Sequence, residues 1–383
     1  MVSEKRLLEL LKDLIRIRSV NPDLVPGGNG EEEIARFIGT YMESMGLSVR
    51  YQEVAPGRLN AIGVLKGIDG GRSLMLNGHI DTVGVEGMSI DPLDPVLRDD
   101  RVYGRGSFDM KGGVAAMIEA VNAVVDSGIS LKGDVVVACV CDEEYASMGT
   151  EAVAREYVTD AAIVTEPTAC RVCVAHKGFA WVKVEVTGKA AHGSLPSEGV
   201  DAIVGAGKFL SRLDLYARET LAAKEHPLLG SPSVHASLIE GGSNLSTYPS
   251  RCIVQLERRT VPGESKETVE KEMEIIIQAV REKDPKFQAS ADVFFTRPPF
   301  EVPVEEPVVR AVSEAVGETL GREAEYIGSH PWLDSAILSG AGIPTVIFGP
   351  DGYGAHGAVE YVDFPSVVDT ARVLFSAISR FAG

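Results

Sequence analysis

Acidic and imidazole side chains recur in this sequence where strands or glycine-rich turns are expected to end. The first pair, His79 and Asp81, lies at the end of the apolar run 74–80. Open α/β sheets keep their ligands at the carboxyl ends of strands, and side chains two apart on a strand point the same way. Asp81 can therefore hydrogen-bond His79 and orient it, as metal-binding histidines usually require. If this pair stood alone, a core histidine satisfied by a neighbouring acid would explain it better.

Four further segments carry the same kinds of side chain and change that interpretation. They are 104–113, 142–144, 165–168 and 354–357. Each segment by itself could be a turn, a helix cap or a solvated surface, but carboxylates brought together repel unless they are protonated or neutralised by cations. A mixture of imidazole nitrogen and carboxylate oxygen without thiolate suits zinc, cobalt or manganese, and it disfavours an iron–sulfur or blue-copper site.

Length and charge limit what this chain can be. With 383 residues it is too long for one ordinary hydrophobic core, which predicts two domains or one large domain with an insertion. The net charge of -18 argues against a nucleic-acid partner, since binding to phosphates needs a basic surface. Acidic balance by itself identifies no other partner.

The chain shows no pattern typical of a membrane segment or an export signal. Segment 3–15 places leucines at helical spacing among charges of both signs, which indicates an amphipathic helix and not a signal peptide. No apolar run approaches the length of a membrane span. The five cysteines lack the paired spacing of a zinc or disulfide framework, so we interpret them as small buried hydrophobes. These features predict a cytoplasmic location and no membrane partner.

The hydrophobic pattern changes twice along the chain. From residue 1 to 177 helical and strand patterns alternate, which predicts an α/β fold with a mixed, mostly parallel sheet flanked by helices. Segment 178–296 follows the order strand, helix, strand, strand, helix, strand, which is the ferredoxin-like α+β unit. After it the α/β pattern returns. We therefore predict a catalytic metal-binding domain, 1–177 and 297–383, interrupted by an inserted domain.

The order of the motifs resembles that of a known enzyme family. It runs His-x-Asp at 79–81, Gly-Arg-Gly-x-x-Asp-x-Lys-Gly-Gly at 104–113, Asp-Glu-Glu at 142–144, Glu-Pro-Thr at 166–168 and Gly-x-His at 354–356. The co-catalytic dizinc peptidases and deacylases share this order; they include acetylornithine deacetylase, succinyl-diaminopimelate desuccinylase, aminoacylase and carboxypeptidase G. The resemblance spans nearly the whole chain. It implies a zinc-exopeptidase-like catalytic domain with an inserted lid or dimerisation domain.

The resemblance also implies two divalent metal ions, with zinc expected and cobalt or manganese as alternatives, held by five ligands. The ligands are His79, Asp109, Glu144, Glu166 and His356. Asp109 would bridge the two ions, with His79 and Glu166 completing one site and the other two ligands completing the second. Glu143 would be the general base, and Asp81 would orient His79. The peptide bond that follows Asp109 would be cis.

A second set of candidate residues lies in the inserted segment. The loop around His192 resembles the family's lid motif, whose histidine stabilises the tetrahedral oxyanion and, in dimers, can come from the neighbouring subunit. Segment 248–264 resembles the stretch that ends in an arginine for the substrate carboxylate, and the spacing places Arg259 there. Where the family often has an asparagine this chain has Ser246, so Asn244 is the candidate polar partner. The resemblance implies a homodimer formed through the inserted domain.

We therefore expect a metal-dependent hydrolase that cleaves the amide bond of an N-acyl amino acid, in the manner of a deacetylase or desuccinylase. Water activated by two metal ions would attack the amide carbon while Glu143 takes its proton. A metallo-exopeptidase acting on short peptides, as a carboxypeptidase or dipeptidase, is the alternative among enzymes. A metal-binding scaffold protein without turnover is the alternative outside them.

Overall fold

The computed structural model describes residues 1–383 and divides the chain into two compact units. The first unit comprises Met1–Val174, Val302–Ile327 and Leu333–Gly383, and the second comprises Ala175–Glu301 and Gly328–Trp332. The predicted insertion, 178–296, lies within the long segment of the second unit. The short segment 328–332 falls in the stretch that the sequence pattern assigns to the catalytic domain. None of the helices combines the length and the apolar character needed to cross a membrane.

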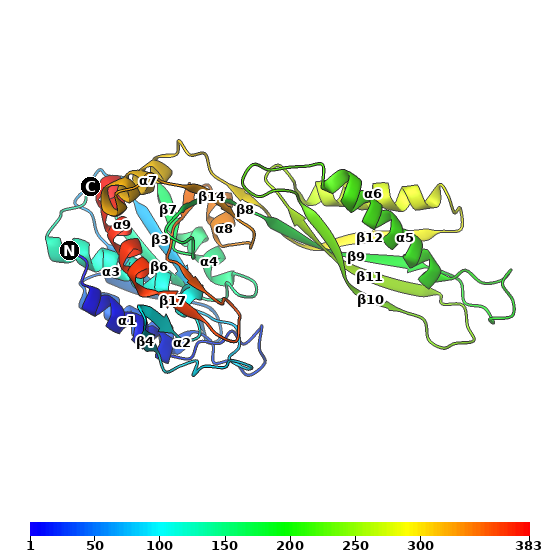
Figure 1. The fold of residues 1–383 in the computed structure, drawn as a ribbon, viewed down its shortest axis with the longest axis horizontal. Helices are drawn as coiled ribbons and strands as arrows, with labels where there is room; N and C mark the ends of the chain where they lie inside the picture. Colours follow the sequence, from blue (N-terminus) through cyan, green and yellow to red (C-terminus); the bar gives the residue numbers. More distant parts are fainter. The chain divides into compact units, whose positions relative to one another are not determined.

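The main sheet has nine strands and is mixed (Figure 1). Its strand order is β1-β2-β6-β3-β7-β15-β8-β13, with β14 also paired to β8. The central pairs β6–β3, β3–β7 and β7–β15 are parallel, whereas β1–β2, β2–β6, β15–β8 and β8–β13 are antiparallel. The bounds are β1 Ser48–Ala55, β2 Arg58–Leu65, β3 Leu74–His79, β6 Val135–Val140, β7 Ala161–Val164, β8 Val172–His176, β13 Phe300–Glu301, β14 Tyr326–Ser329 and β15 Thr345–Ile347. The prediction of a mixed sheet is confirmed, with its parallel strands at the centre.

Helices flank this sheet and bury apolar side chains against it (Figure 1). They are α1 Glu4–Arg16, α2 Glu32–Ser44, α3 Gly112–Ser127, α4 Met148–Glu156, α7 Pro307–Leu320, α8 Ser335–Gly340 and α9 Phe364–Ala382. Helix α3 is rich in Ala, Val and Gly and is buried along most of its length. At Gly113 a Cβ atom would lie 2.0 Å from the carbonyl oxygen of Thr165. Only glycine therefore lets the start of α3 approach the end of β7 this closely.

A small third sheet joins two loops that are far apart in the sequence. Its strand order is β16-β17-β5-β4 and all its pairs are antiparallel. The bounds are β4 Val96–Arg98, β5 Arg101–Tyr103, β16 Gly352–Tyr353 and β17 Tyr361–Asp363. Strand β5 leads into the π-helical turn η1, Ser107–Lys111, and β16 and β17 frame the loop with His356. The pairing of β5 with β17 therefore brings the η1 turn and the His356 loop together.

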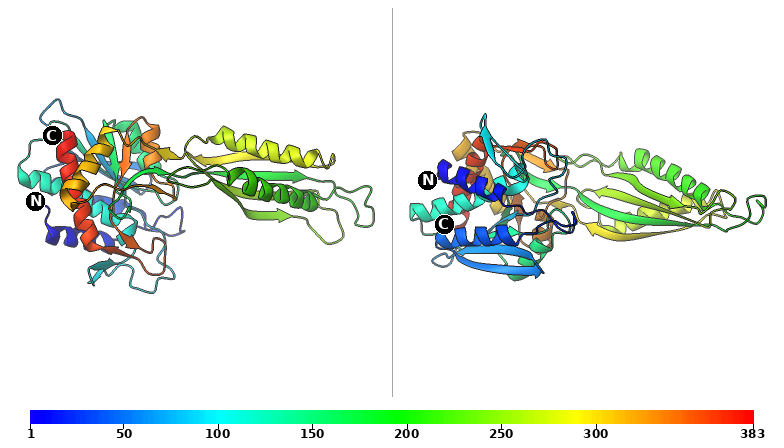
Figure 2. Two further views of the ribbon diagram at one scale, coloured as in Figure 1. Left: turned by 45° about the horizontal axis from the view of Figure 1, so that its top comes forward. Right: turned by 90° about the horizontal axis from the view of Figure 1, so that it is seen from below.

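The second unit follows the predicted order of strands and helices (Figures 1 and 2). The elements are β9 Gly178–Thr187, α5 Ala202–Tyr216, the π-helical turn η2 Ala217–Leu221, β10 Ser233–Gly241, β11 Arg251–Thr260, α6 Lys266–Arg281 and β12 Gln288–Arg297. The sheet order is β10-β11-β9-β12 and every pair is antiparallel. Alternate residues of β9, such as Val182 and Val184, pack with Phe209 of α5 and Met273 of α6. Both helices thus cover one face of the sheet, and the predicted ferredoxin-like fold is confirmed.

A buried cation ties the sheet of the second unit to α6. Arg258 on β11 is fully buried; its Nε donates to Glu272 at 2.9 Å and an Nη donates to Glu264 at 2.7 Å. Lys224 donates to the same two glutamates, at 2.9 and 2.7 Å. Buried charges are costly unless they stay paired, so removal of one member leaves its partners unsatisfied.

We expect Arg258→Met to destabilise the chain by about 3 kcal/mol, because Glu272 would stay buried without its main cation. Equilibrium urea unfolding followed by circular dichroism measures this change. Arg251→Met is the matched control, since Arg251 lies on the same strand and pairs with Glu185 at 2.6 Å on the surface, where ion pairs contribute little. Equal effects of the two substitutions would show that the buried network contributes no more than a surface pair.

Candidate metal centre

The carboxyl ends of three neighbouring strands deliver most of the predicted site residues. Strand β3 ends at His79, the strand β6 leads into Glu143 and Glu144, and β7 leads into Glu166. Because β6, β3 and β7 are adjacent and parallel, these ends meet at one edge of the sheet. The sheet therefore positions four of the candidate side chains through its topology alone.

Asp109 lies between the two candidate histidines. Its Oδ1 is 3.1 Å from Nε2 of His79, and its Oδ2 is 3.4 Å from Nε2 of His356. The two oxygens of one carboxylate thus face two different imidazoles. The peptide bond between Asp109 and Met110 is cis, as the resemblance implied. This is the arrangement expected of a bridging carboxylate.

Each histidine also has a glutamate beside it. Nε2 of His356 lies 2.9 Å from Oε2 of Glu144, and Nε2 of His79 lies 3.6 Å from Oε1 of Glu166. Ligand atoms within 4.8 Å of one another form two groups that share His79, one with Asp109 and Glu144 and one with Glu143 and Glu166. The side chain of His356 is 54% exposed, whereas that of His79 is 1% exposed. The cluster therefore reaches from the buried sheet edge to the surface.

The pKa values of the cluster reflect crowded negative charge. Burial and the neighbouring carboxylates raise the pKa of Glu143 and of Glu166 well above the usual range. Burial and the charge of Asp109 raise the pKa of Glu144 to about 7. Burial acts against ionisation of Asp109 too, but hydrogen bonds with His356 and His79 keep its pKa well below the usual range. Without added cations, burial and mutual repulsion therefore favour the protonated forms of the three glutamates.

The donor set fits two divalent ions. The carboxylates of Asp109, Glu143, Glu144 and Glu166 carry a charge of about −4 when ionised, and two divalent ions would supply about +4 beside neutral imidazoles. Nitrogen and oxygen donors without thiolate suit zinc, cobalt or manganese. The residues present are thus compatible in charge and in chemistry with the pair of ions expected from the motifs.

Asp81 contacts more groups than His79, the one partner that the sequence predicted for it. Its backbone carbonyl oxygen lies 3.0 Å from Nδ1 of His79, and its Oδ1 lies 3.5 Å from the same nitrogen. The carboxylate also accepts hydrogen bonds from the backbone N–H groups of Glu143, at 3.1 Å, and Glu144, at 3.2 Å. Asn21 donates its Nδ2 to Asp81 at 2.8 Å. Asp81 therefore positions His79 and the turn with the two glutamates at once.

A buried network, absent from the predicted site, supports this turn. Asn21 donates to Asp142 at 3.0 Å, and Arg58 donates to Asp142 at 2.8 Å and to Glu31 at 2.7 Å. All four side chains are buried. Asp142 directly precedes Glu143 and has a φ of 70°, a backbone conformation that costs free energy unless its surroundings hold it. The network therefore fixes the backbone from which the glutamates extend.

Glu360 holds the turn with Asp109 from the other end of the chain. Its buried carboxylate accepts three backbone N–H bonds at 3.0 to 3.1 Å, from Gly106, Phe108 and Asp109. It also accepts Nη1 of Arg105 at 2.6 Å. Glu360 belongs to no motif. The one feature of the sequence that could have indicated its role is that it is an acidic residue inside the short apolar stretch 358–362.

The lysine of the glycine-rich motif, Lys111, makes contacts that account for its place in the motif. It is buried, and its Nζ donates to the carbonyl oxygens of Leu14 and Ile17 at 2.9 Å each. Burial lowers its pKa to about 7. These bonds tie the turn with Asp109 to the C-terminal end of α1, so the role of this lysine is to position the loop.

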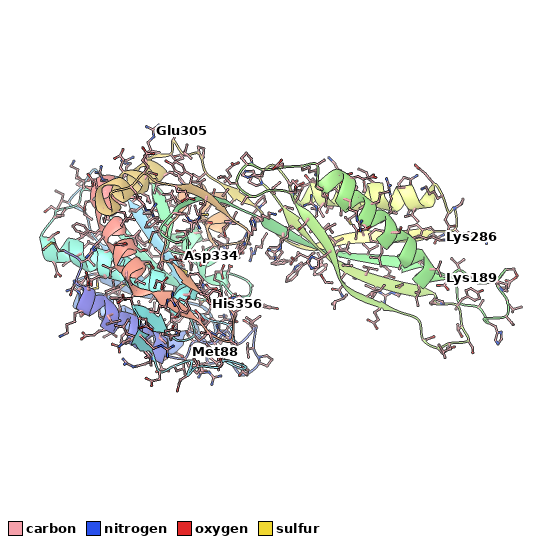
Figure 3. All side chains as sticks on the ribbon, in the orientation of Figure 1. Met88, Lys189, Lys286, Glu305, Asp334 and His356 are labelled. Carbon is pink, nitrogen blue, oxygen red and sulfur yellow. The ribbon has the colours of Figure 1, made fainter.

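Asp334, labelled with His356 in Figure 3, adds one more buried acid to the first unit. Its Oδ2 accepts the hydroxyl of Thr150 at 2.6 Å, and Thr150 in turn accepts Nδ2 of Asn77 at 3.2 Å. Burial raises the pKa of Asp334 to about 6. Its charge also contributes to the raised pKa of Glu143.

A profile of peptidase family M20/M25/M40 matches residues 75–380. The chain belongs to this family. An acetylornithine deacetylase of Myxococcus xanthus is 31% identical over 89% of this chain and 90% of that protein. An N-formyl-4-amino-5-aminomethyl-2-methylpyrimidine deformylase of Bacillus subtilis is 28% identical over 98% of this chain and 94% of that protein.

Solved structures of two peptidases share the fold. A tripeptidase from Staphylococcus aureus has a TM-score of 0.80 at 23% identity, covering 100% of this chain and 99% of that one. A dinuclear metal-binding M20 peptidase from Bacillus subtilis has a TM-score of 0.76 at 17% identity, covering 99% of both chains. The predicted fold class is confirmed. Membership of the M20 family also confirms the prediction of a metal-dependent hydrolase of amide bonds.

The remaining predicted residues, His192, Asn244 and Arg259, lie in the second unit. His192 is exposed, and its Nδ1 is 2.8 Å from Oγ of Ser194. Asn244 accepts the N–H of Ser246 at 3.0 Å, and the carbonyl oxygen of Ser246 accepts an N–H from the His192 loop at 2.8 Å. The loops that carry His192 and Asn244 therefore lie side by side.

Arg259 lies at the other end of the same sheet. It is paired with Phe179 at the start of β9, whereas the His192 loop follows the end of β9, where Thr187 is paired with Arg251. Arg259 and Arg251 are 8 residues apart along β11, which corresponds to about 27 Å at the usual rise of a strand. The structure therefore does not bring Arg259 and His192 of one chain together.

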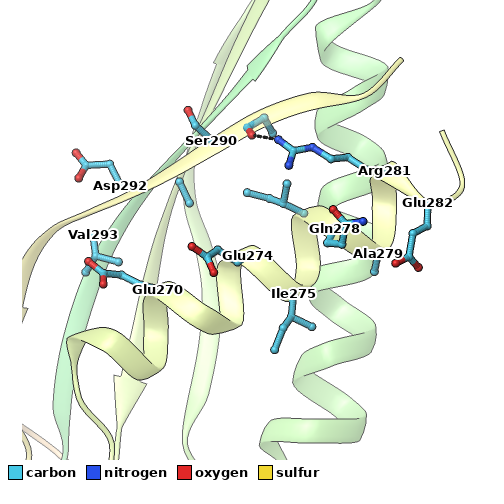
Figure 4. A pocket seen from close by; sticks show the side chains of 13 residues that line it. Glu270, Glu274, Ile275, Gln278, Ala279, Arg281, Glu282, Ser290, Asp292 and Val293 are labelled. Carbon is cyan, nitrogen blue, oxygen red and sulfur yellow. Dashed lines mark hydrogen bonds between the residues drawn. The ribbon is translucent and has the colours of Figure 1, made fainter. Parts of the chain in front are cut away.

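A cavity of about 890 Å³ lies between α6 and β12 (Figure 4). Acidic residues such as Glu270 and Asp292 line it, and Arg281 donates to the carbonyl oxygen of Ala289 across it at 2.7 Å. It contains none of the predicted site residues. The cluster of acids and histidines at the sheet edge is therefore the better candidate for the chemistry of an M20 enzyme.

We expect Glu360→Gln to lower zinc affinity by about tenfold to a hundredfold, because groups that orient metal ligands have effects of this size. The amide loses the charge paired with Arg105 and presents an NH₂ group to N–H donors. Competition with a chromophoric chelator measures the affinity. The control is Glu305→Gln, an exposed acid of the first unit (Figure 3). Equal zinc affinities of the two variants would remove Glu360 from the set of positioning residues.

Proposed function

We propose that this M20 enzyme removes the acyl group from an N-acyl amino acid by hydrolysing the amide bond. The observation that carries the proposal is the carboxylate of Asp109, whose oxygens lie 3.1 and 3.4 Å from two different histidines. In this proposal Asp109 would hold both of two zinc ions. His79 and Glu166 would complete one site, and the remaining pair, Glu144 and His356, would complete the other. Cobalt and manganese suit the same donors.

Glu143 is the proposed proton carrier, because it stands outside the two ligand pairs but lies 4.0 Å from His79. Two divalent ions bound in the cluster would polarise the substrate carbonyl and lower the pKa of a water molecule. Glu143 accepts the proton of the attacking water and then donates it to the leaving amine. Asp81 keeps the backbone of Glu143 and the ring of His79 in place during both steps.

Two features favour an N-acyl substrate that carries a free carboxylate. By their names, the relatives from Myxococcus xanthus and Bacillus subtilis remove an acetyl and a formyl group. Arg259 offers a guanidinium fork, which suits a free carboxylate. A metallo-exopeptidase is the second candidate, because a short peptide presents the same amide bond and the same free carboxylate.

The test measures turnover of the zinc-reconstituted chain on N-acetyl, N-formyl and N-succinyl amino acids and on dipeptides, with zinc content determined on the same samples. We expect one N-acyl class to be preferred. Glu143→Gln should lower kcat by about 10³-fold, as expected for loss of a general base, with zinc content near that of the wild type.

Each of the other possible results would contradict a different part of the proposed function. Loss of zinc together with activity in Glu143→Gln would make Glu143 a ligand. A preference for dipeptides would place the chain among the exopeptidases. Bound zinc without turnover on any compound would favour a metal-binding scaffold.

We also propose a homodimer in which His192 of one subunit stabilises the oxyanion in the active site of the other. The separation of Arg259 from the His192 loop, about 27 Å by strand spacing, supports this arrangement. A small substrate cannot span that distance. Both residues can therefore contact one substrate only if they come from different subunits.

Mixed dimers test this arrangement. Glu143→Gln and His192→Ala subunits, each nearly inactive alone, should regain about a quarter of wild-type activity when co-expressed, because half of the dimers are mixed and one of their two sites is intact. The readout is the specific activity of the mixture against that of each parent. If His192 acts within its own subunit, mixing restores nothing.

A further inference from the structure

A groove lies between helices α5 and α6 of the second unit (Figure 1), and we call it the helix groove. Its lining includes Lys208, Arg212 and Leu215 of α5 and Val280 of α6, together with Lys283 just beyond the end of α6. The three α5 residues are spaced by four and three positions, so their side chains leave the helix on one face. The volume of the groove is about 800 Å³, within the range of about 300 to 1,000 Å³ that is usual for small-molecule sites.

Apolar side chains form part of the lining of the helix groove. Val204 of α5 is 54% exposed and Leu215 is 39% exposed, whereas Val280 is 6% exposed. Val204 and Leu215 lie 11 residues apart on α5, which corresponds to about 17 Å at the rise of an α-helix. The groove therefore offers a long apolar surface that is open to solvent, and an extended apolar chain would bury that surface on binding.

Cationic side chains lie in the helix groove beside these apolar groups, and two of them have no counterion. Lys208 donates to Asp284 at 2.7 Å, which lowers the pKa of that carboxyl and keeps it ionised. Asp284 is the one acid in the lining, and Arg212 and Lys283 form no ion pair. Two positive charges therefore remain unpaired in a chain whose net charge is -18.

Arg212 also has a buried donor without an acceptor. Its Nε is shielded from solvent and donates no hydrogen bond within the chain. Such a group costs free energy, and buried polar groups of folded proteins nearly always have a partner. A water molecule would supply an acceptor but not the negative charge that Arg212 and Lys283 lack. An anionic oxygen inside the groove supplies both, and a guanidinium binds carboxylate or phosphate by paired hydrogen bonds.

The cavity between α6 and β12 has the opposite charge. Glu270 and Glu274 of α6 line it together with Asp292 of β12 (Figure 4). These carboxylates repel an anion, whereas the unpaired cations of the helix groove attract one. The two sides of α6 therefore differ in the charge of the ligand that they favour.

We propose that the helix groove binds an amphipathic anion, an apolar chain that ends in a carboxylate or a phosphate. The anionic end accepts hydrogen bonds from Arg212 and lies beside Lys283, and the chain runs along Val204 and Leu215. A neutral chain would leave both cations unpaired, and a short anion would leave the apolar side chains in water. This site lies wholly within the second unit and does not depend on the proposed function.

Isothermal titration calorimetry of the full-length, zinc-loaded chain with decanoate measures this binding. We expect one decanoate per chain with a Kd of about 100 µM. Hexanoate, with a shorter chain, and decanol, without a charge, should each bind at least about tenfold more weakly. Decyl phosphate in a parallel titration distinguishes the two anionic ends, because the end that the groove favours gives the lower Kd.

Two variants and a control locate the binding site. Arg212→Gln should raise the Kd for decanoate about tenfold and remove the preference over decanol, because the amide lacks the charge of the guanidinium. Leu215→Ser should raise the Kd about fivefold and keep the preference over decanol. Lys271→Gln is the matched control, because it removes an exposed charge of α6 outside the groove. Circular dichroism of each variant checks that the fold is retained.

Several results would overturn the proposal. Equal affinities for decanoate and decanol would show that the cations of the groove take no part in binding. Binding that survives both Arg212→Gln and Leu215→Ser would place the ligand outside the helix groove. Equal losses in Lys271→Gln and Arg212→Gln would reveal a general effect of surface charge, and a wild-type chain that binds neither decanoate nor decyl phosphate would leave no ligand of this class for the groove.

Discussion

The first unit depends on holding four carboxylates within reach of only two imidazoles. Asp109, Glu143, Glu144 and Glu166 repel one another, and the contacts with His79 and His356 offset only part of that repulsion. A chain folded for stability alone would separate such groups or pair each of them with arginine or lysine. The parallel strands, the glycine-rich turn and the small sheet instead bring them together, at a cost in free energy that bound cations would offset.

The surroundings of the cluster keep it from spreading apart. The acids are held through their backbone: Asp81 accepts the N–H groups of Glu143 and Glu144, and Glu360 accepts that of Asp109. Such bonds fix the backbone of each acidic residue and leave its carboxylate available to bind a metal ion. Asn21, Arg58 and Lys111 add a layer of buried polar contacts behind these backbone bonds. The centre is thus preorganised by groups that need not touch a metal ion or a substrate.

The sequence alone was sufficient to predict those parts of the architecture that leave a pattern in neighbouring residues. His79, Glu143 and Glu166 each follow an apolar strand, and the motif order places them at one sheet edge. The βαββαβ order of the second unit follows from alternating patterns over 178–296. Local patterns do not report which strands pair or in what direction, so the sequence predicted a mixed sheet without showing that its antiparallel strands lie at the edges. Strands of two or three residues, such as β16 and β17, are too short to show a period. Glu360 and Asn21 act through contacts across 251 and 60 residues and carry no motif.

The link between Glu360 and Asp109 also constrains how the enzyme is made. A ribosome releases the chain from its N-terminus, so β3, β6 and β7 can be complete while the last part of the chain is still being synthesised. Until then the turn with Asp109 lacks the carboxylate that accepts three of its N–H groups, and His356 is missing as well. The two ions of the proposed function would therefore be bound late in biosynthesis, and a nascent chain stalled before residue 356 would carry the acids of the centre without the second histidine.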